Sequence, residues 1–198
     1  NNPKLEEDGL GGAIITWQDK RTGSDYDIYA QKIDASGAVQ WAANGVGVCV
    51  GSNTQNNPRI EPDGSNGAII AWTDKRVGLD YDIYVQRLNS SGVAQWTGNG
   101  VAVCTAMGNQ SALDIKYLGS NGVALSWKDQ RAITTDIYAQ IVSLTGVPVI
   151  IANGVKISSS LKSLNPNNIS DGSGGVIVAW EDSTSTGWNI SSQKINGA

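Results

Sequence analysis

Four short apolar stretches that each end in tryptophan decide the fold: AIITW (13–17), AIIAW (68–72), VALSW (123–127) and VIVAW (176–180). The tryptophans Trp17, Trp72, Trp127 and Trp180 are 55, 55 and 53 residues apart. A nearly fixed period of this length indicates one supersecondary unit that is copied in tandem and buries its surface against its neighbours. Because each stretch is apolar at almost every position, we expect a strand that is covered on both faces.

The second repeat shows most clearly how one unit is built. Asp63–Gly67 and Asn89–Gly92 are turn sequences, and the segment DIYVQRL alternates in polarity as a half-buried strand does. The sequence predicts four antiparallel strands, at 58–62, 68–72, 82–88 and 93–104, the last interrupted at 98–100. Repeat one has the same third strand at 27–33, and repeat four has it at 189–195.

The predicted fold class is therefore all-β, a β-propeller of four-stranded antiparallel blades with about four blades in this chain. We predict one domain over 1–198, with repeats at 3–57, 58–112, 113–166 and 167–198, the last lacking its fourth strand. Three arrangements stay open: a closed four-bladed ring, part of a larger propeller or half of one completed by a second chain, and an open array. Incomplete edges pair readily with other molecules, so a homo-oligomer through the blade edges also stays open.

Composition excludes several classes of function. The formal net charge is −4, so no basic stripe for nucleic acid or anionic membrane is expected, and no apolar stretch is long enough to insert into a bilayer. The chain has no histidine, which removes Ser-His-Asp and Cys-His catalysis and the commonest transition-metal ligand. Cys49 and Cys104 occupy equivalent places in successive repeats, and we expect two separate thiols rather than a disulfide.

The order of these elements resembles the blades of sialidase-like (BNR-repeat) β-propellers, especially repeat segments of large secreted or surface-attached bacterial proteins. The shared features are the proline-led strand, the Asp-Gly turn, the W-x-D-x-R motif, the DIY segment and a glycine turn before tryptophan. The W-x-D-x-R motif begins at Trp17, Trp72 and Trp127, whereas repeat four has Thr184 in place of the arginine. The Asp-box S-x-D-x-G-x-T-W is not reproduced, and Arg21, Arg76 and Arg131 recur at equivalent places, as structural residues do. The resemblance therefore implies a propeller fold without sialidase activity.

The loop after W-x-D-x-R is the predicted ligand-binding site. It contains Asp25-Tyr26 and Asp80-Tyr81, and repeat four has Trp188-Asn189. An aromatic ring can stack on the apolar face of a sugar while a neighbouring carboxylate or amide binds hydroxyls. The alternative is that the rings only cover the blade edge and their hydroxyl groups bond locally. Asp25 with Asp27, and Asp80 with Asp82, also bring oxygens together, but no calcium-loop spacing accompanies them, so no metal or cofactor is expected.

These observations predict a non-catalytic adhesion, interaction or scaffold module, outside the cell or at its surface, with no catalytic residues. The first alternative is a lectin-like carbohydrate-binding propeller that uses the Tyr26, Tyr81 and Trp188 row. The second is a remnant of a sialidase-like glycoside hydrolase, in which Glu181 is the one acid that breaks the repeat pattern. The expected partner is a glycan or another surface protein, and neither nucleic acid nor membrane insertion is expected.

Overall fold

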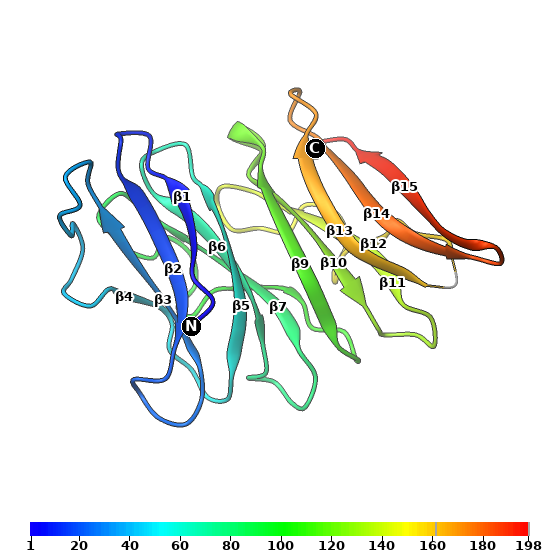
Figure 1. Ribbon diagram of the computed structural model, residues 1–198, viewed down its shortest axis with the longest axis horizontal. Coiled ribbons are helices and arrows are strands. Elements are labelled where there is room, and N and C mark those ends of the chain that lie inside the picture. The colour runs from blue at the N-terminus through cyan, green and yellow to red at the C-terminus, as the bar shows by residue number, and fades with distance from the viewer. Residues whose placement is uncertain (161, 198) are drawn as a thin grey trace. The chain divides into compact units, whose positions relative to one another are not determined.

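The computed structural model describes residues 1–160 and 162–197, and antiparallel strands make up most of its regular structure. The strands form four sheets, here called sheets 1 to 4 in chain order, which hold β1–β4, β5–β8, β9–β12 and β13–β15 (Figure 1). The single helical segment in this described part is a 3₁₀ turn at Gly119–Asn121. The prediction of an all-β chain built from four repeated units is confirmed at this level.

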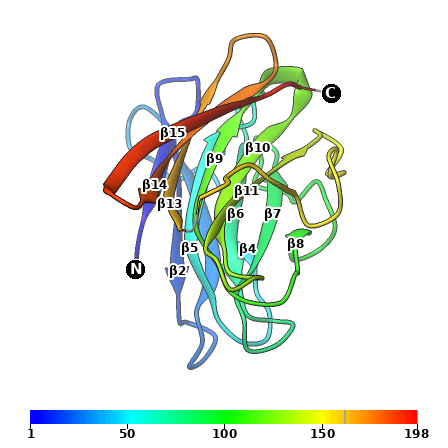
Figure 2. The same ribbon diagram turned by 90° about the vertical axis from the view of Figure 1, so that its right-hand side faces the viewer.

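The strand bounds repeat from sheet to sheet. Sheet 1 contains β1 (Lys4–Glu7), β2 (Ala13–Asp19), β3 (Asp27–Ile33) and β4 (Val46–Cys49). Sheet 2 contains β5 (Gln55–Pro62), β6 (Ala68–Asp74), β7 (Asp82–Leu88) and β8 (Val101–Cys104). Sheet 3 contains β9 (Gln110–Tyr117), β10 (Val123–Asp129), β11 (Asp136–Val142) and β12 (Val155–Lys156). Sheet 4 contains β13 (Ser163–Ser170), β14 (Val176–Thr184) and β15 (Gly187–Ile195), and β15 lies at its edge (Figure 2).

Two compact units divide the chain. The first comprises Asn1–Gly78 and Tyr84–Ala102, and the second comprises Leu79–Ile83 and Val103–Ala198. Sheet 1 and most of sheet 2 belong to the first unit, and sheets 3 and 4 belong to the second. The prediction that 1–198 is one domain stays a prediction.

Within each unit, one sheet packs face to face on the next. The core of the first unit joins Ile14 and Ile28 of sheet 1 to Ile70 and Trp72 of sheet 2. In the second unit the equivalent core joins Ile137 of sheet 3 to residues of sheet 4, namely Val176, Val178 and Trp180. Because side chains alternate along a strand, each sheet has two distinct faces. In each sheet, we call the face that carries Ile14 or its equivalent residue the forward face. The opposite face carries the tryptophan of the W-x-D-x-R motif or its equivalent, and we call it the rear face.

The fourth strand is shorter than predicted, because an Asn-Gly turn precedes it. Asn99 and Gly100 have φ angles of 62° and 90°, a conformation that no strand adopts. A Cβ on Gly100 would lie 2.5 Å from Cη2 of Trp72, so the turn packs directly on the indole. The same pair of residues recurs at Asn44-Gly45 and Asn153-Gly154. The regular strand β8 therefore starts only at Val101, not at the predicted Val93.

The predicted repeat boundaries fall inside first strands rather than between sheets. The pairing of β5 with β6 shifts register between Asn56 and Arg59, and Asn57 there has a φ of 54°. The equivalent residues Ala112 in β9 and Asn165 in β13 also have positive φ. These are β-bulges, which interrupt the local pattern while the strand continues through them. A bulge reads as a turn in the sequence, and this explains the misplaced boundaries at 57, 112 and 166.

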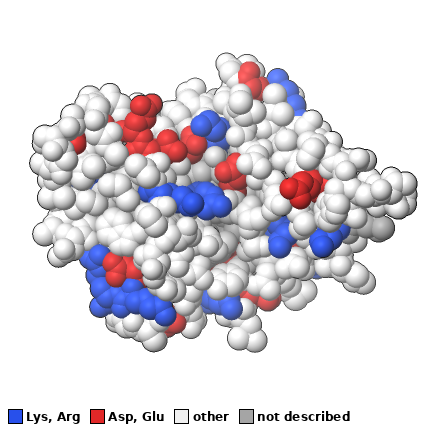
Figure 3. All heavy atoms as spheres, in the orientation of Figure 1, with Lys and Arg blue, Asp and Glu red and all other residues white. Residues whose placement is uncertain are grey.

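Charged side chains of both signs lie close to one another on the face shown in Figure 3. This mixture agrees with the small net charge of −4. Among the described residues, no helix is both long enough and apolar enough to cross a membrane.

Candidate functional site

The W-x-D-x-R motif forms a hydrogen-bonded network centred on its aspartate. In sheet 2, Trp72 Nε1 donates to Asp74 at 2.8 Å, and Arg76 donates to the same carboxylate through its amide at 2.8 Å and its Nε at 2.9 Å. The Arg76 guanidinium also donates to the carbonyl of Asn99 at 2.8 Å and lies 4.0 Å from the centre of the Tyr84 ring. Sheets 1 and 3 repeat these contacts around Arg21 and Arg131. The arginines are thus engaged with the carboxylates and turn carbonyls of their own sheets, and Arg76 and Arg131 also contact a cysteine of the preceding sheet.

Both cysteines are free and buried, as the sequence predicts. Arg76 Nη2 lies 2.9 Å from the Cys49 sulfur, and Cys104 has the same relation to Arg131 at 3.2 Å. Burial raises the pKa of Cys49 to about 12 and that of Cys104 to about 11, despite the nearby arginines. A thiol that stays protonated at neutral pH is a poor nucleophile, so neither cysteine is a catalytic candidate.

In sheet 1, the predicted site residues Asp25 and Tyr26 contact the start of the next first strand. Asp25 accepts a hydrogen bond from the Thr54 hydroxyl at 3.2 Å, and the Tyr26 carbonyl accepts one from the Gln55 amide at 2.7 Å. The half-buried Tyr26 ring lies 4.4 Å from Nζ of Lys20, and its hydroxyl accepts a hydrogen bond from Asn1. These contacts support the alternative in which the ring covers a sheet edge and bonds locally.

Asp80 and Tyr81 have equivalent contacts in the second unit. Asp80 accepts a hydrogen bond from the Gly108 amide at 3.0 Å. The Tyr81 amide donates to Asn109 at 3.1 Å, and the Tyr81 carbonyl accepts from the Gln110 amide at 2.8 Å. The loop therefore fixes the start of a first strand, whether or not its side chains also bind a ligand.

Trp188 and Asn189 lie in a strand, which agrees with the predicted strand at 189–195 for Asn189, whereas the prediction of a loop is wrong for Trp188. Both belong to β15, because β14 and β15 extend as a long hairpin that turns at Thr184–Gly187. Trp188 is 53% exposed, and Nζ of Lys162 lies 5.7 Å from its ring centre. Asn189 pairs with Asp182 across the hairpin. Of the predicted aromatic residues, Trp188 is the exposed one.

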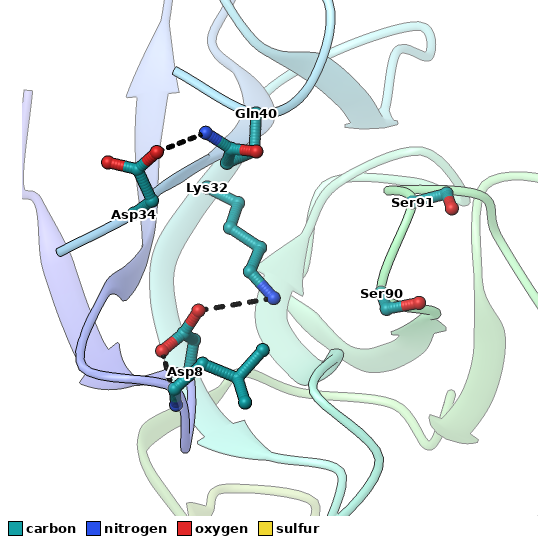
Figure 4. A pocket seen from close by; sticks show the side chains of 7 residues that line it. Asp8, Lys32, Asp34, Gln40, Ser90 and Ser91 are labelled. Atoms are coloured by element: carbon teal, nitrogen blue, oxygen red, sulfur yellow. Dashed lines mark hydrogen bonds and ion pairs between the residues drawn. The ribbon is translucent and has the colours of Figure 1, made fainter. Parts of the chain in front are cut away.

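A cavity lies in the first unit at the opposite ends of the strands. It has a volume of about 360 Å³ and lies between sheets 1 and 2, where the first and third turns of sheet 1 meet the third turn of sheet 2. We call it the turn cavity. Its lining comprises Asp8, Leu10, Lys32, Asp34, Gln40, Ser90 and Ser91 (Figure 4).

A buried ion pair forms one wall of the turn cavity. Nζ of Lys32 lies 3.2 Å from the Asp8 carboxylate and donates to the carbonyl of Asn66 at 2.9 Å. The backbone amide of Leu10 is the main cause that lowers the pKa of Asp8; burial opposes it, and the Gly12 amide and Lys32 lower it further. Asp63–Arg87 and Asp171–Lys194 are equivalent pairs in sheets 2 and 4, so this pair is part of the repeat.

The third turn of sheet 1 provides the neighbouring wall. Asp34 accepts hydrogen bonds from the Ser36 hydroxyl, the Ala38 amide and the Ser36 amide, which together hold the pKa of its carboxyl below the ordinary value. Gln40 Nε2 donates to the other Asp34 oxygen at 2.7 Å. Gln40 Nε2 also donates to the Ala38 carbonyl at 3.1 Å, so both of its hydrogens are used within the turn. The Gln40 and Asp34 oxygens can accept hydrogen bonds, which a sugar hydroxyl can donate.

Across the cavity, the exposed Ser90 and Ser91 are held in place by a tryptophan of the other sheet. Trp41 Nε1 donates to the Ser90 carbonyl at 2.9 Å, and a Cβ on Gly92 would lie 2.8 Å from the Trp41 ring. The Asn89 side chain caps this turn by accepting from the amides of Ser91 and Val93, both at 3.0 Å. Ser90 and Ser91 therefore line the cavity from a well-fixed turn.

A second cavity adjoins the first. It has a volume of about 220 Å³, is lined by Glu7, Gly9, Pro62, Gly64 and Asn66, and shares Asp8 with the turn cavity. The two cavities are thus neighbours between sheets 1 and 2, with the Asp8 side of the ion pair between them. Within residues 1–160 and 162–197, no group of three or more His, Cys, Asp or Glu side chains is arranged to hold a metal ion.

Sequence reasoning missed the turn cavity, because its walls come from residues that are 50 or more positions apart. The available signal was Trp41, which was interpreted only as a packing residue. Its recurrence one turn after a D/N-x-S-G sequence indicates that an indole reaches the corresponding turn of the next repeat. The lining residues Asp34, Gln40 and Ser90 could then have been inferred.

Comparisons with known proteins identify the fold. No family model matches the chain, and no curated protein matches it. An endo-arabinase from Bacteroides thetaiotaomicron VPI-5482 matches with a TM-score of 0.56 and 13% identity, over 98% of this chain and 74% of that one. An endo-1,4-β-xylanase from the same organism matches with a TM-score of 0.51 and 11% identity, over 98% of this chain and 75% of that one.

These neighbours correct two predictions. The prediction of a non-catalytic adhesion, interaction or scaffold module is contradicted, because both similar structures are carbohydrate-active enzymes. The prediction that the chain is not an enzyme is contradicted by the same finding. The resemblance to sialidase-like blades holds only as a β-rich fold, and a sialidase relationship is not supported. At 11–13% identity the likeness shows the fold alone, and it transfers no activity.

Proposed function

We propose that this chain is a carbohydrate-binding domain of the β-propeller type and that the turn cavity receives the sugar. The observation that carries the proposal is a cavity of about 360 Å³ with hydrogen-bonding groups on opposite walls and the exposed Leu10 beside them. Pockets for small ligands have volumes of a few hundred Å³ and combine a few fixed polar groups with apolar surface. For such a ligand we also propose an extracellular or cell-surface location.

The fold neighbours support a polysaccharide as the ligand class. The two similar structures are an arabinase and a xylanase, so a chain of this fold is compatible with binding pentose polymers. The turn cavity and its neighbour share Asp8, so a ligand of more than one sugar unit can contact both. Arabinan and xylan are therefore the first ligands to test.

The test measures binding of soluble arabinan and xylan by affinity electrophoresis and calorimetry. Gln40→Ala removes an amide from the cavity, and we expect it to weaken binding about 3- to 10-fold, the effect of one lost hydrogen bond. The matched control is Gln95→Ala, because Gln95 has the equivalent position in sheet 2 and donates to the Val93 carbonyl as Gln40 donates to that of Ala38. Equal binding by both variants, or no binding by the parent chain, would refute the cavity site.

The site that the sequence predicts in the loops after W-x-D-x-R is tested in the same series of binding measurements. The sequence assigned Asp25, Tyr26, Asp80, Tyr81, Trp188 and Asn189 to the site, and Tyr81→Ala tests that assignment directly. If Tyr81→Ala abolishes binding while Gln40→Ala has no effect, the sugar binds at the loops and the turn cavity is not the site.

A second candidate function is glycoside hydrolysis, which the likeness to two glycoside hydrolases favours. Hydrolysis requires two carboxyl groups on either side of the scissile bond. Asp34 lines the turn cavity and Glu7 lines the neighbouring cavity, in addition to the ion-paired Asp8 that lines both. Release of reducing sugar from arabinan or xylan, lost in both Glu7→Gln and Asp34→Asn, would establish this activity, and release that persists in both would exclude these residues.

A further inference from the structure

The contact between successive sheets has the same composition in both units. The forward face of sheet 1 contributes Ile14, Ile28 and Ala30 to a core with Ile70 and Trp72 on the rear face of sheet 2. In the second unit, the forward face of sheet 3 contributes Ala124, Ile137 and Ala139 to a core with Val176, Val178 and Trp180 on the rear face of sheet 4. One type of interface, forward face on rear face, therefore occurs twice in the described chain.

Sheet 4 has a forward face of the same kind that is exposed. Ile190 of β15 is 75% exposed, whereas the equivalent residues Ile28, Ile83 and Ile137 are 0% exposed. Ile177 is 38% exposed, whereas its equivalent Ile14 is 1% exposed. Ile169 pairs with Ile177, and Ile190 pairs with Glu181, so these side chains share the forward face. The exposed Trp188, two residues before Ile190 on β15, lies on the same face. Four large apolar side chains on one face exceed the scattered exposed residues that a soluble surface usually shows.

Sheet 1 has the complementary rear face. Leu5 of β1 is 63% exposed, whereas its equivalents Ile60 and Ile115 are 6% and 4% exposed. Leu5 pairs with Ile15 across the sheet, and Ile15 and Trp17 are only partly buried, unlike Ile70 and Trp72.

We propose that the forward face of sheet 4 binds the rear face of sheet 1 in a second copy of this chain, head to tail. The proposal extends an interface that the molecule already uses twice, and it matches an apolar face to the kind of apolar face that covers it within each unit. Such a head-to-tail contact is heterologous. If the rotation between two copies forms a closed ring, the pair covers the forward face of sheet 4 and the rear face of sheet 1 in each chain; if it does not, a longer assembly forms. Two chains would contribute eight sheets, which is within the range of closed propellers.

A polar residue on the forward face of sheet 4 supports the same head-to-tail contact. In sheet 1, the forward-face residue Gln18 accepts a hydrogen bond from the Asn57 amide of sheet 2 at 3.1 Å and donates to Asn56 at 3.2 Å. Sheet 4 has Glu181 at this position. A carboxylate there can accept a hydrogen bond from the amide of Asn2 in the second copy, because Asn2 occupies the place of Asn57 and has a similar φ, 49° against 54°.

The experiment measures the mass of the 198-residue chain by light scattering and sedimentation over a series of protein concentrations. We expect an assembly of two or more copies that dissociates on dilution. Ile190→Lys and Leu5→Lys each place a charge in the interface, and each is expected to raise the dissociation constant about 30-fold or more. Both positions are exposed in the single chain, so folding is expected to persist and is checked by circular dichroism. Ile133→Lys is the control, because Ile133 is fully exposed on a loop of sheet 3.

Mixing the two variants distinguishes head-to-tail contact from other modes. If the assembly is a closed pair, a mixed pair of Ile190→Lys and Leu5→Lys chains has one undamaged interface and one doubly damaged interface, whereas each variant alone has two damaged ones. One buried lysine is enough to remove most of an interface, so a second lysine in the same interface adds little, and we therefore expect the mixture to associate more tightly than either variant. Pairing of two β15 edges would be insensitive to Leu5→Lys and would overturn the proposal. A chain that is monomeric at every concentration would overturn it as well.

Discussion

Replacing Asp74 by alanine tests whether the W-x-D-x-R network stabilises the sheet. The Asp74 carboxylate is fully buried and accepts hydrogen bonds from Trp72 Nε1, the Arg76 amide and the Arg76 guanidinium. The substitution removes the carboxylate that pairs with the Arg76 guanidinium, and the Arg76 side chain is only 19% exposed. It also leaves the buried Trp72 N–H without a hydrogen-bond acceptor. Breaking a buried pair on one side costs about 3–5 kcal/mol, and because Arg76 retains some access to water we expect about 3 kcal/mol.

The assay is equilibrium unfolding in urea, followed by tryptophan fluorescence at one fixed protein concentration. The free energy of unfolding is obtained from the midpoint and the slope, and all variants are compared under the same conditions. Asp74→Asn keeps the shape and one acceptor oxygen, so it should lose less than Asp74→Ala. Asp25→Ala is the control, because this exposed aspartate accepts one long hydrogen bond, and a change within about 0.5 kcal/mol is expected. A loss below about 1 kcal/mol in Asp74→Ala would refute the structural role of the network.

Three further predictions concern backbone conformation and burial. Gly100→Ala should lower the free energy of unfolding in urea by about 2–5 kcal/mol, the sum of positive-φ strain and the clash with Trp72. Gly98 has open space around it, so Gly98→Ala should change the free energy of unfolding by less than about 0.5 kcal/mol. Ala112→Asn should stabilise by about 0.5–1 kcal/mol, because Ala112 has a φ of 48° at a bulge where the other repeats have asparagine; a lower melting temperature would contradict this. Cys49 should react with a thiol reagent at pH 8 only as fast as the protein opens, because burial raises its pKa to about 12, and a fast native-state reaction would be inconsistent with that burial.

Much of the fold could be predicted from the sequence, because local pattern and tertiary environment agree along most strands. The predicted burial on both faces is confirmed for β6, whereas β2 and β14 alternate between buried and more exposed residues, so it is wrong for them. The third strands at 27–33 and 82–88 have the predicted bounds. The fourth strands were predicted too long, since residues 93–100 alternate in polarity while their backbone forms bridges and turns. The repeat boundaries at 57, 112 and 166 fall inside first strands, because a β-bulge interrupts the local pattern while the strand continues through it.

The candidate site was less predictable, because its residues act through contacts between repeats. The repeated aromatic and acidic residues at 25–26 and 80–81 are visible in the sequence, but their backbone groups mainly fix the next first strand. The turn cavity depends on Trp41 reaching the turn that holds Ser90, a relation that spans 49 residues. A single sequence indicates which residues recur, but it does not show which repeat each one contacts.

Sheet 3 provides a natural comparison for the ion pair that lines the turn cavity. Where sheet 1 has Asp8 and Lys32, sheet 3 has Leu118 and Ile141, both buried in the core of the second unit. A buried ion pair replaced by apolar residues often leaves stability unchanged, whereas removal of one partner leaves an uncompensated charge. We therefore expect Asp8→Leu combined with Lys32→Ile to unfold at a higher urea concentration than Asp8→Leu alone. If the double variant is instead the less stable of the two, the pair contributes more than the apolar contact that replaces it in sheet 3. A double variant that folds as well as the parent but no longer binds arabinan or xylan would assign the pair to the ligand rather than to the fold.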